Sequence, residues 1–494
     1  MNSVNISYDD VNGGSQQYSG SKSRKRILVT TLASALVFGA VVFLAVGISS
    51  PGRDEDVGTD RLRRWESTSN VVKDACSGTL YPELCVSSIS SFEGLSSNAG
   101  PIEIVNAAVS VGMDAVQRVM AQTRSLSRPG LDFRQRGALQ DCMEMFDDTL
   151  DELNATHSDL HNATFLSMPK HTADLRTFLS AAITNQYTCL EGFQLCNGHL
   201  KEDLKGGLQY VSRLVSNSLA MVCNISEKAK RALGDADSVD GTSRRHLLSE
   251  EFMSSDEDGF PSWMSVGDRR LLQAPAGSIR ANAVVAKDGS GHFTNIAAAV
   301  AAAPQKSKTR YVIHVRRGVY RENLDISKNK HNIMFIGDGK GVTVVTARRS
   351  VQDGYTTFHS ATVGVTGKAF IARDITFENT AGPAKHQAVA LRVGSDFSAF
   401  YRCSFKGYQD TLYVHSLRQF YRECDIHGTV DFIFGNAAVV FQNCNLMARR
   451  PLANQKIMYT AQGRQDPNQN TGISIQNCRL TADSDLARVK RSFQ

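Results

Sequence analysis

The stretch CSFKGYQDTLYVHSLRQFYRECDIHGTVDFIFGNAAVVFQNCNL, residues 403–446, contains a repeat of about 20 residues. Cys403 and Cys424 are 21 residues apart, and Asp410 and Asp431 lie seven residues after them. Repeats of this length with short strands and no helices favour a parallel β-helix. The stretch therefore predicts stacked coils that bring the two aspartates side by side.

Similar signatures recur through residues 283–494, where short apolar segments follow one another. Neighbouring coils of a β-helix lie about 4.8 Å apart. That separation falls within the range of about 4.4–6.8 Å between Cα atoms that a disulfide requires. We expect Cys424 and Cys444 to pair, and stacked free thiols in the core are the alternative.

Two adjacent carboxylates cannot both ionise comfortably, so one pKa of the pair should rise. One aspartate would then act as nucleophile or base while the other donates a proton. Gln409 precedes Asp410, and Gln387 lies on an otherwise apolar strand, so two amides could donate to a developing oxyanion. Spacing alone leaves open a purely structural ladder of polar residues for Asp410, Asp431, Gln409 and Gln387.

Residues 71–230 place apolar side chains at helical spacing, with few glycines and prolines. The expected disulfides here are Cys76–Cys85 at the start and Cys142–Cys189 between helices, although spacing does not fix the connectivity. Residues 231–275 read as an exposed processing linker with two basic-dileucine sites. These sites are Arg244-Arg245-His246-Leu247-Leu248 and Arg269-Arg270-Leu271-Leu272.

Residues 27–48 carry no charge, and a helix of this length would span the roughly 30 Å core of a bilayer. The basic residues just before it predict a signal anchor with residues 1–26 in the cytosol and the remainder in the lumen. We therefore expect a membrane-anchored precursor in the secretory pathway, where disulfides form. Its expected glycosylation sites are Asn154, Asn162 and Asn224.

The length of 494 residues predicts two or three domains. The net charge of +6 is uneven: residues 273–494 hold 29 Lys and Arg against 15 Asp and Glu, and 29 − 15 = +14. A basic region of this kind could bind a polyanion such as nucleic acid, an acidic polysaccharide or an anionic membrane, although its scattered charges fit a solvated surface about as well. No zinc-finger spacing and no aromatic RNA-binding motif accompanies it, so no nucleic-acid partner is expected.

The segments GSGHFTNIAAAV, GVYRENLDI, DITFENTAGP, GYQDTLY and GTVDFIFGNA resemble plant pectin methylesterases, and this resemblance runs through residues 283–494. The segments CSGTLYPELC and AAITNQYTCLEGF resemble the inhibitor-like pro-region of that family. The resemblance implies an all-α four-helix pro-domain followed by a right-handed parallel β-helix. It also implies an enzyme of the cell wall that hydrolyses galacturonate methyl esters of pectin and requires no metal or organic cofactor.

Carried over residue by residue, the resemblance makes Asp431 the nucleophile and Asp410 the general acid and later the base. It makes Gln409 and Gln387 stabilisers of the oxyanion and places Thr357 in the substrate site. It likewise assigns the disulfide to Cys424 and Cys444, and cleavage by a processing protease to the two basic-dileucine sites.

One departure concerns the end of the sequence. The family continues with a Leu-Gly-Arg-Pro-Trp segment, whose arginine holds the nucleophilic carboxylate, whereas this chain ends at Gln494. We expect a β-helix that is incomplete at its C-terminal end and an enzyme of reduced activity. Two other hypotheses remain: an inhibitor or binding protein acting through the helical region, and a β-helical polygalacturonase or pectate lyase.

Overall fold

The structure is a computed structural model that describes residues 70–96, 98–234 and 259–489. The predicted cytosolic tail, the predicted anchor at 27–48 and the basic-dileucine site at Arg244-Arg245 lie outside the described residues. Within the described ranges, no helix is both long enough and apolar enough to cross a membrane.

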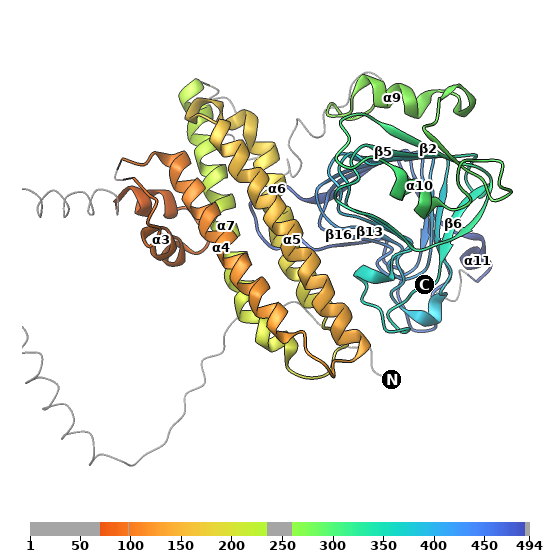
Figure 1. Cartoon of the computed structure of the whole chain (residues 1–494), viewed down its shortest axis with the longest axis horizontal. Helices are drawn as coiled ribbons and strands as arrows, with labels where there is room; N and C mark the ends of the chain where they lie inside the picture. Colours follow the sequence, from red (N-terminus) through yellow and green to blue (C-terminus); the bar gives the residue numbers. More distant parts are fainter. Residues whose placement is uncertain (1–69, 97, 235–258, 490–494) are drawn as a thin grey trace, which may run out of the picture. The chain divides into compact units, whose positions relative to one another are not determined.

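The helical region is a four-helix bundle in which each long helix packs against two others (Figure 1). Asp132 begins α5 by accepting a hydrogen bond from the Gln135 backbone N–H at 2.8 Å, and the Gln135 side chain accepts from Asp132 N–H in return. Gly234 ends α7 in the left-handed conformation. The helices are α3 (Pro82–Ser90), α4 (Pro101–Leu126), α5 (Phe133–Asn162), α6 (Met168–Glu191) and α7 (Leu200–Leu233), with the short η1 (Phe165–Ser167) before α6.

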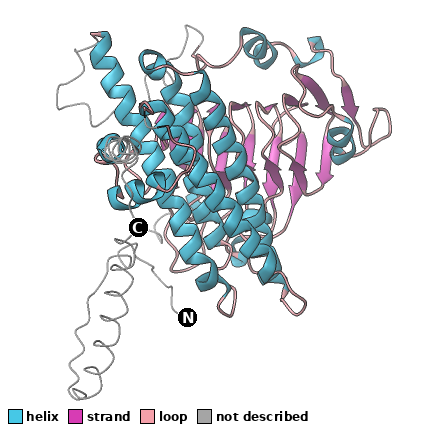
Figure 2. Cartoon of the chain, turned by 60° about the vertical axis from the view of Figure 1, so that its left-hand side comes forward, coloured by secondary structure: helices cyan, strands magenta, loops and turns pink. Residues whose placement is uncertain are grey.

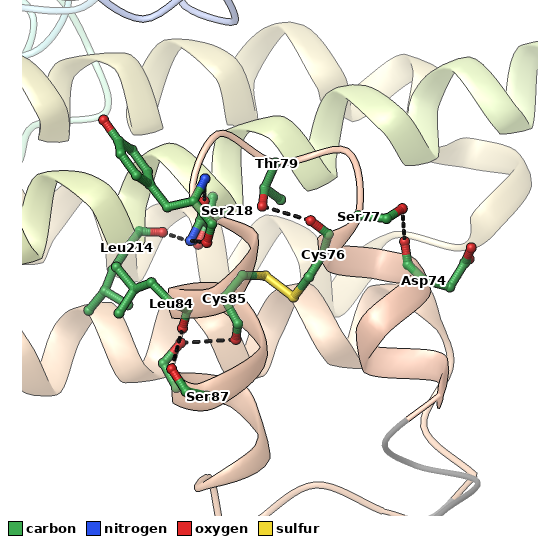
Figure 3. Close-up of a disulfide and its surroundings, with 12 residues drawn as sticks. Asp74, Cys76, Ser77, Thr79, Leu84, Cys85, Ser87, Leu214 and Ser218 are labelled. Atoms are coloured by element: carbon green, nitrogen blue, oxygen red, sulfur yellow. Dashed lines mark hydrogen bonds between the residues drawn. A yellow bond between two sulfur atoms is a disulfide. The ribbon is translucent and has the colours of Figure 1, made fainter.

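Both disulfides predicted in this region are present. Cys76 and Cys85 close the loop before α3, and Figure 3 shows the bond beside the Thr79 hydroxyl, which donates to the Cys76 carbonyl. Cys142 on α5 joins Cys189 on α6, so this disulfide ties two neighbouring helices together.

The β-helix consists of three parallel sheets, whose strands are drawn in magenta in Figure 2. Each complete coil passes through the three sheets in turn, as β11, β12 and β13 do before β14 begins the next coil. The parallel β-helix predicted from the repeat is therefore confirmed.

The eight-stranded sheet contains β1 (Ala283–Val285), β2 (Tyr311–Val315), β5 (Ile333–Gly337), β8 (Ile371–Arg373), β11 (Ser398–Tyr401), β14 (Arg418–Arg422), β17 (Ala438–Gln442) and β20 (Gly472–Gln476). The seven-stranded sheet contains β3 (Gly318–Arg321), β6 (Thr343–Ala347), β9 (Thr376–Asn379), β12 (Ser404–Lys406), β15 (Asp425–Gly428), β18 (Asn445–Ala448) and β21 (Arg479–Ala482). The six-stranded sheet contains β4 (Leu324–Ile326), β7 (Val363–Val365), β10 (Leu391–Val393), β13 (Leu412–Val414), β16 (Ile433–Gly435) and β19 (Thr460–Gln462). Short helical segments precede, connect or follow these strands: η4 (Ala276–Ser278), α10 (Ile296–Ala302), η5 (Phe358–Ser360), η6 (Pro383–Lys385) and α11 (Ser484–Ala487).

The interior of the β-helix is a stack of equivalent side chains. The rings of Phe400, Tyr421 and Phe441 lie one above another on β11, β14 and β17, with centroids 4.7 and 4.8 Å apart. Buried aromatic area of this kind stabilises each coil against the next. Because the stack holds the register of successive coils, it also fixes the positions of residues on their outer faces.

The predicted Cys424–Cys444 disulfide is absent, and both residues are buried free thiols. They belong to the cysteine ladder, which consists of Cys403, Cys424, Cys444 and Cys478 at the same turn of successive coils. Each Sγ lies within hydrogen-bonding distance of backbone carbonyls, and that of Cys424 is 3.3 Å from the Arg422 oxygen. The structure therefore shows the alternative of stacked thiols, in which each thiol contacts backbone carbonyls and the thiols of neighbouring coils.

The linker predicted for 231–275 is wrong at both ends. The chain is still helical at Leu233, and residues 259–275 pack on the eight-stranded sheet. Phe260, Met264 and Leu272 are buried there, and Arg269 and Arg270 lie in α9 (Val266–Gln273). The apolar residues are spaced widely among Ser, Asp and Gly, which explains why composition alone indicated an exposed segment.

Candidate active site

Asp410 and Asp431 occupy equivalent positions on adjacent coils. Each lies two residues before a strand of the six-stranded sheet, and these strands pair in register from Leu412 with Ile433. The Asp410 N–H donates to the Val430 carbonyl at 3.0 Å, directly before Asp431. The structure thus brings together the two aspartates that the 21-residue spacing predicts.

Both aspartates have positive φ angles, 62° for Asp410 and 49° for Asp431. This left-handed conformation is uncommon for residues other than glycine, although Asp adopts it more readily than most. Such backbone geometry persists where the surrounding structure enforces it and is frequent at functional sites. Equivalent turns on two adjacent coils therefore hold the two carboxylates, each between a strand of the seven-stranded sheet and a strand of the six-stranded sheet.

The environments of the two carboxylates differ. Asp410 is only 8% exposed, and burial, then the charge of Asp431 and then that of Glu191 raise its pKa well above the ordinary value. Asp431 is half-buried, and burial raises its pKa as well. The more deeply buried group favours the protonated form, so the pair suits a proton donor at Asp410 beside an ionised Asp431.

The predicted amides and the threonine lie around this pair. The Gln409 backbone carbonyl accepts from the Ala388 N–H at 3.2 Å, and the Gln409 side-chain oxygen is buried with no hydrogen-bond partner among the described residues. Gln387 and Thr357 both line a cavity of about 120 Å³, and Glu191 of α6 lies on its wall. The structure thus places Gln387 and Thr357 in one cavity and Gln409 next to Asp410, while their catalytic roles remain predictions.

Sequence reasoning missed Arg449, which holds the chain immediately before Gln409. Its guanidinium donates to the Gly407 carbonyl and to the Tyr408 hydroxyl, both at 2.8 Å, and lies 3.8 Å from the centre of the Tyr408 ring. In the sequence, the adjacent pair Arg449-Arg450 suggests two solvent-exposed side chains. Its partners become clear only when the chain returns two coils later, because Gly407 and Tyr408 follow β12 and Arg449 follows β18.

Sequence reasoning also missed how closely α6 approaches this face. Thr188 Oγ1 lies 2.9 Å from His415 Nε2, and Thr184 Oγ1 accepts from Asn436 Nδ2 at 2.8 Å. Burial raises the pKa of Glu191 to about 7. The face that carries the aspartates is therefore in direct contact with the helical region.

Among the described residues, no cluster of three His, Cys, Asp or Glu side chains could hold a metal ion. The groups able to do chemistry here are the two carboxylates and the neighbouring amides. The fold and this site together define the class of β-helical proteins whose paired aspartates are suited to hydrolytic chemistry.

Comparison with known proteins identifies the family. The profile described as Pectinesterase matches residues 282–494, and the profile described as Plant invertase/pectin methylesterase inhibitor matches residues 70–221. Pectinesterase 2 of Arabidopsis thaliana is 52% identical over 441 residues, which are 88% of this chain and 75% of that protein. Pectinesterase/pectinesterase inhibitor U1 of Solanum lycopersicum is 46% identical over 485 residues, covering 97% of this chain and 82% of that protein.

Among solved structures, the pectin methylesterase from carrot is 64% identical, covering 44% of this chain and 69% of that chain with a TM-score of 0.44. The two long sequence matches extend through the helical region and the β-helix. The chain therefore belongs to the pectinesterase family of carboxylic ester hydrolases, in the group with an inhibitor-like N-terminal region.

Proposed function

We propose that the chain hydrolyses the methyl esters of galacturonate residues in pectin, with Asp431 as nucleophile and Asp410 as acid and base. The observation that carries this proposal is the placement of two aspartates at equivalent positions with unequal burial. The family of the chain and its basic β-helix support an acidic polysaccharide as the substrate.

In the first step, a carboxylate oxygen of Asp431 attacks the ester carbonyl carbon. Gln409 and Gln387 donate to the resulting oxyanion, and Asp410 gives its proton to the departing methoxy oxygen, so methanol leaves. In the second step, Asp410 takes a proton from water as the water oxygen attacks the acyl group. This attack releases the free galacturonate acid and restores Asp431.

The test is methanol release from methylated pectin by the full chain and by Asp431→Asn. Asp288→Asn is the matched control, because Asp288 lies in an exposed turn of the same β-helix. Loss of methanol release in Asp431→Asn alone would support the assignment. Equal rates in the two variants would refute Asp431 as the nucleophile.

We also propose that the helical region restricts access to this site within the same chain, rather than acting as a free inhibitor. Glu191 beside Asp410 and the contact between Thr188 and His415 support this proposal. Arg176 of α6 adds two hydrogen bonds to the Asn468 carbonyl, at 2.9 and 3.1 Å.

The measurement for this restriction is methanol release by Arg176→Ala, with Arg213→Ala as the control. Arg213 lies over the Tyr81 ring on the surface of the helical region, 5.3 Å from the ring centre, so its loss leaves the contact with the β-helix intact. Faster release in Arg176→Ala alone is expected. An unchanged rate in both variants would contradict the restriction.

For the cellular setting, we propose a membrane-anchored, glycosylated precursor in the secretory pathway whose catalytic part reaches the cell wall after proteolysis. The exposure of Asn154 and Asn162 on α5 and the two disulfides of the helical region support this proposal. A mass shift after glycosidase treatment of protein from plant membranes would test it, and unglycosylated protein in the cytosol would refute it.

A further inference from the structure

Arg449 contacts both of the turns that carry the paired aspartates. We call residues 407–410 the first turn and residues 428–431 the second turn, because each begins at a glycine and ends at an aspartate of the pair. The Arg449 guanidinium donates to the Gly407 carbonyl at 2.8 Å, and the Arg449 backbone N–H donates to the Gly428 carbonyl at 2.7 Å. One residue therefore joins the beginnings of both turns.

A second contact fixes the arginine over the first turn. Its Nη2 donates to the Tyr408 hydroxyl at 2.8 Å, and its guanidinium carbon lies 3.8 Å from the centre of the Tyr408 ring. The planar guanidinium offers its donors in a rigid fork, so stacking and two hydrogen bonds together leave it one orientation. Tyr408 precedes Gln409, whose side-chain oxygen has no hydrogen-bond partner among the described residues. The backbone of the first turn therefore largely decides where the Gln409 amide lies.

The two turns are packed tightly against each other. A Cβ atom at Gly428 would lie 2.2 Å from Phe432 Cβ and 2.7 Å from Thr411 Oγ1, and a Cβ atom at Gly407 would also lie 2.7 Å from Thr411 Oγ1. Thr411 is fully buried, and its hydroxyl lies 3.1 Å from the Tyr408 carbonyl. Because no free space separates the turns, a shift of one must displace the other.

The backbone of each turn is strained at its aspartate, where φ is 62° for Asp410 and 49° for Asp431. Such conformations persist only where the surrounding structure enforces them. Two hydrogen bonds between the turns contribute, from the Asp410 N–H to the Val430 carbonyl at 3.0 Å and from the Thr429 N–H to the Tyr408 carbonyl at 2.9 Å. The contacts of Arg449 come from outside both turns and hold them against each other.

Arg449 belongs to the coil after that of Asp431. It directly follows β18, whose last residue, Ala448, pairs with Gly428. Among the described residues, its ion pair is with Asp485, 3.7 Å from Nε, and both side chains are partly exposed. Ion pairs of this kind contribute little, so the main contacts of the guanidinium are those with the first turn.

We propose that Arg449 is a positioning residue for the pair of aspartates, which it serves by clamping the first turn against the second. The clamp sets the separation of the two carboxylates and the direction of the Gln409 amide. Arg449 acts through the backbone of the turns and touches none of the reacting atoms. The expected effect on rate rests on the proposed ester hydrolysis, whereas the clamp itself can be measured without any substrate.

The first test is hydrogen–deuterium exchange of the full chain, followed by mass spectrometry of peptides that cover the two turns. Arg449→Ala should speed exchange of the turn amides about tenfold or more, because local opening becomes easier once the clamp is lost. Arg450→Ala is the matched control, since it removes the same charge from the neighbouring, exposed position. Exchange in this control should equal that of the wild type.

The second test is the rate of methanol release from methylated pectin, expressed per folded molecule. Arg449→Ala should lower kcat about tenfold or more and leave KM unchanged, because misplaced reacting groups slow the chemical step without weakening binding. Guanidinium chloride, at a concentration too low to unfold the protein, should restore part of this kcat and should not raise that of the wild type. A merely structural role would reduce the amount of folded protein and would not be rescued in this way.

Tyr408→Phe is the second variant if Arg449→Ala does not fold, because it removes only the hydroxyl that accepts from Arg449. It should change exchange and kcat in the same direction and to a smaller extent. Exchange that neither variant changes, equal changes in Arg450→Ala, or a wild-type kcat in Arg449→Ala would overturn the proposal. Failure of the proposed hydrolysis would look different: Asp431→Asn would release methanol like the wild type, while the exchange result would still decide the role of the clamp.

Discussion

His415 should make the fold sensitive to acid. Its ring is 2% exposed, with Nε2 2.9 Å from Thr188 Oγ1 and Nδ1 3.0 Å from Ser416 Oγ. Burial, and then the positive charge of Arg392, lowers the pKa of His415 to about 3. In the unfolded chain the pKa of a histidine is about 6.5.

Between pH 6.5 and 3, the unfolded chain therefore binds a proton that the folded chain excludes. The contribution of His415 to stability is complete above pH 6.5 and decreases as the pH falls. The loss is about 1.4 kcal/mol for each pH unit, or about 3 kcal/mol at pH 4.5. Other groups add their own pH dependence, so the comparison must be made with a variant of His415.

The variant is His415→Gln, which offers a hydrogen-bonding amide and does not titrate. Urea denaturation followed by circular dichroism at pH 6.5 and 4.5 gives the free energy of unfolding of each protein. The wild type should lose about 3 kcal/mol more than the variant over this interval. His161→Gln, on the exposed end of α5, is the control. Equal losses in the wild type and in His415→Gln would refute the reasoning.

Three other predictions follow from the site and the helical region. Asp431→Ala should reduce methanol release on the order of a thousandfold or more while circular dichroism stays unchanged, and release within tenfold of wild type would exclude a nucleophilic role. Cys142→Ser opens a disulfide that spans 47 residues to Cys189, which should cost about 4 kcal/mol in urea denaturation; a loss below about 1 kcal/mol would contradict this. Lys328→Ala removes two ion pairs to α5, at 2.5 and 2.6 Å, and should cost about 0.5–1 kcal/mol at low salt because the partners are exposed. That cost should disappear in 1 M salt, and a cost that persists there would show that the contact is not electrostatic.

The sequence predicts the β-helix well because each coil repeats one local pattern. An apolar strand follows a turn, and the residue before each cysteine of the ladder has a positive φ, as Arg402, Glu423 and Asn443 do. Because this turn-and-strand pattern involves residues that are close together in the chain, it is visible in the sequence as a repeat of about 20 residues. The same periodicity correctly predicts that Asp410 and Asp431 lie at equivalent positions on adjacent coils.

Spacing could not decide which cysteines pair. Every step of the ladder brings two thiols to the same separation, so Cys424 has an equivalent neighbour on either side. Here the thiols remain free, and each contacts backbone carbonyls as well as the thiols of neighbouring coils. In the helical region spacing did not fix the connectivity either, and the expected pairing of Cys142 with Cys189 is confirmed only by the structure.

The site residues that were missed all depend on contacts between distant parts of the chain. Arg449 follows a strand two coils after Gly407, so its hydrogen bond to the Gly407 carbonyl cannot be inferred from neighbouring residues. Likewise, nothing in the sequence distinguishes Thr188 from other helical residues, and its contact with His415 is seen only in the structure. Periodicity carries no information about such long-range partners.

The packing of residues 259–275 on the eight-stranded sheet changes what a protease cut at the second basic-dileucine site would produce. Buried Arg373 donates to the carbonyls of Leu271 and Ala274, while Phe260 and Met264 are buried on the other side of Arg270. A cut after Arg270 would thus separate two pieces that both remain bound to the sheet. The immediate product would be a nicked protein of two chains. The rate at which the two chains separate would be set by the dissociation of Phe260 and Met264 from the sheet.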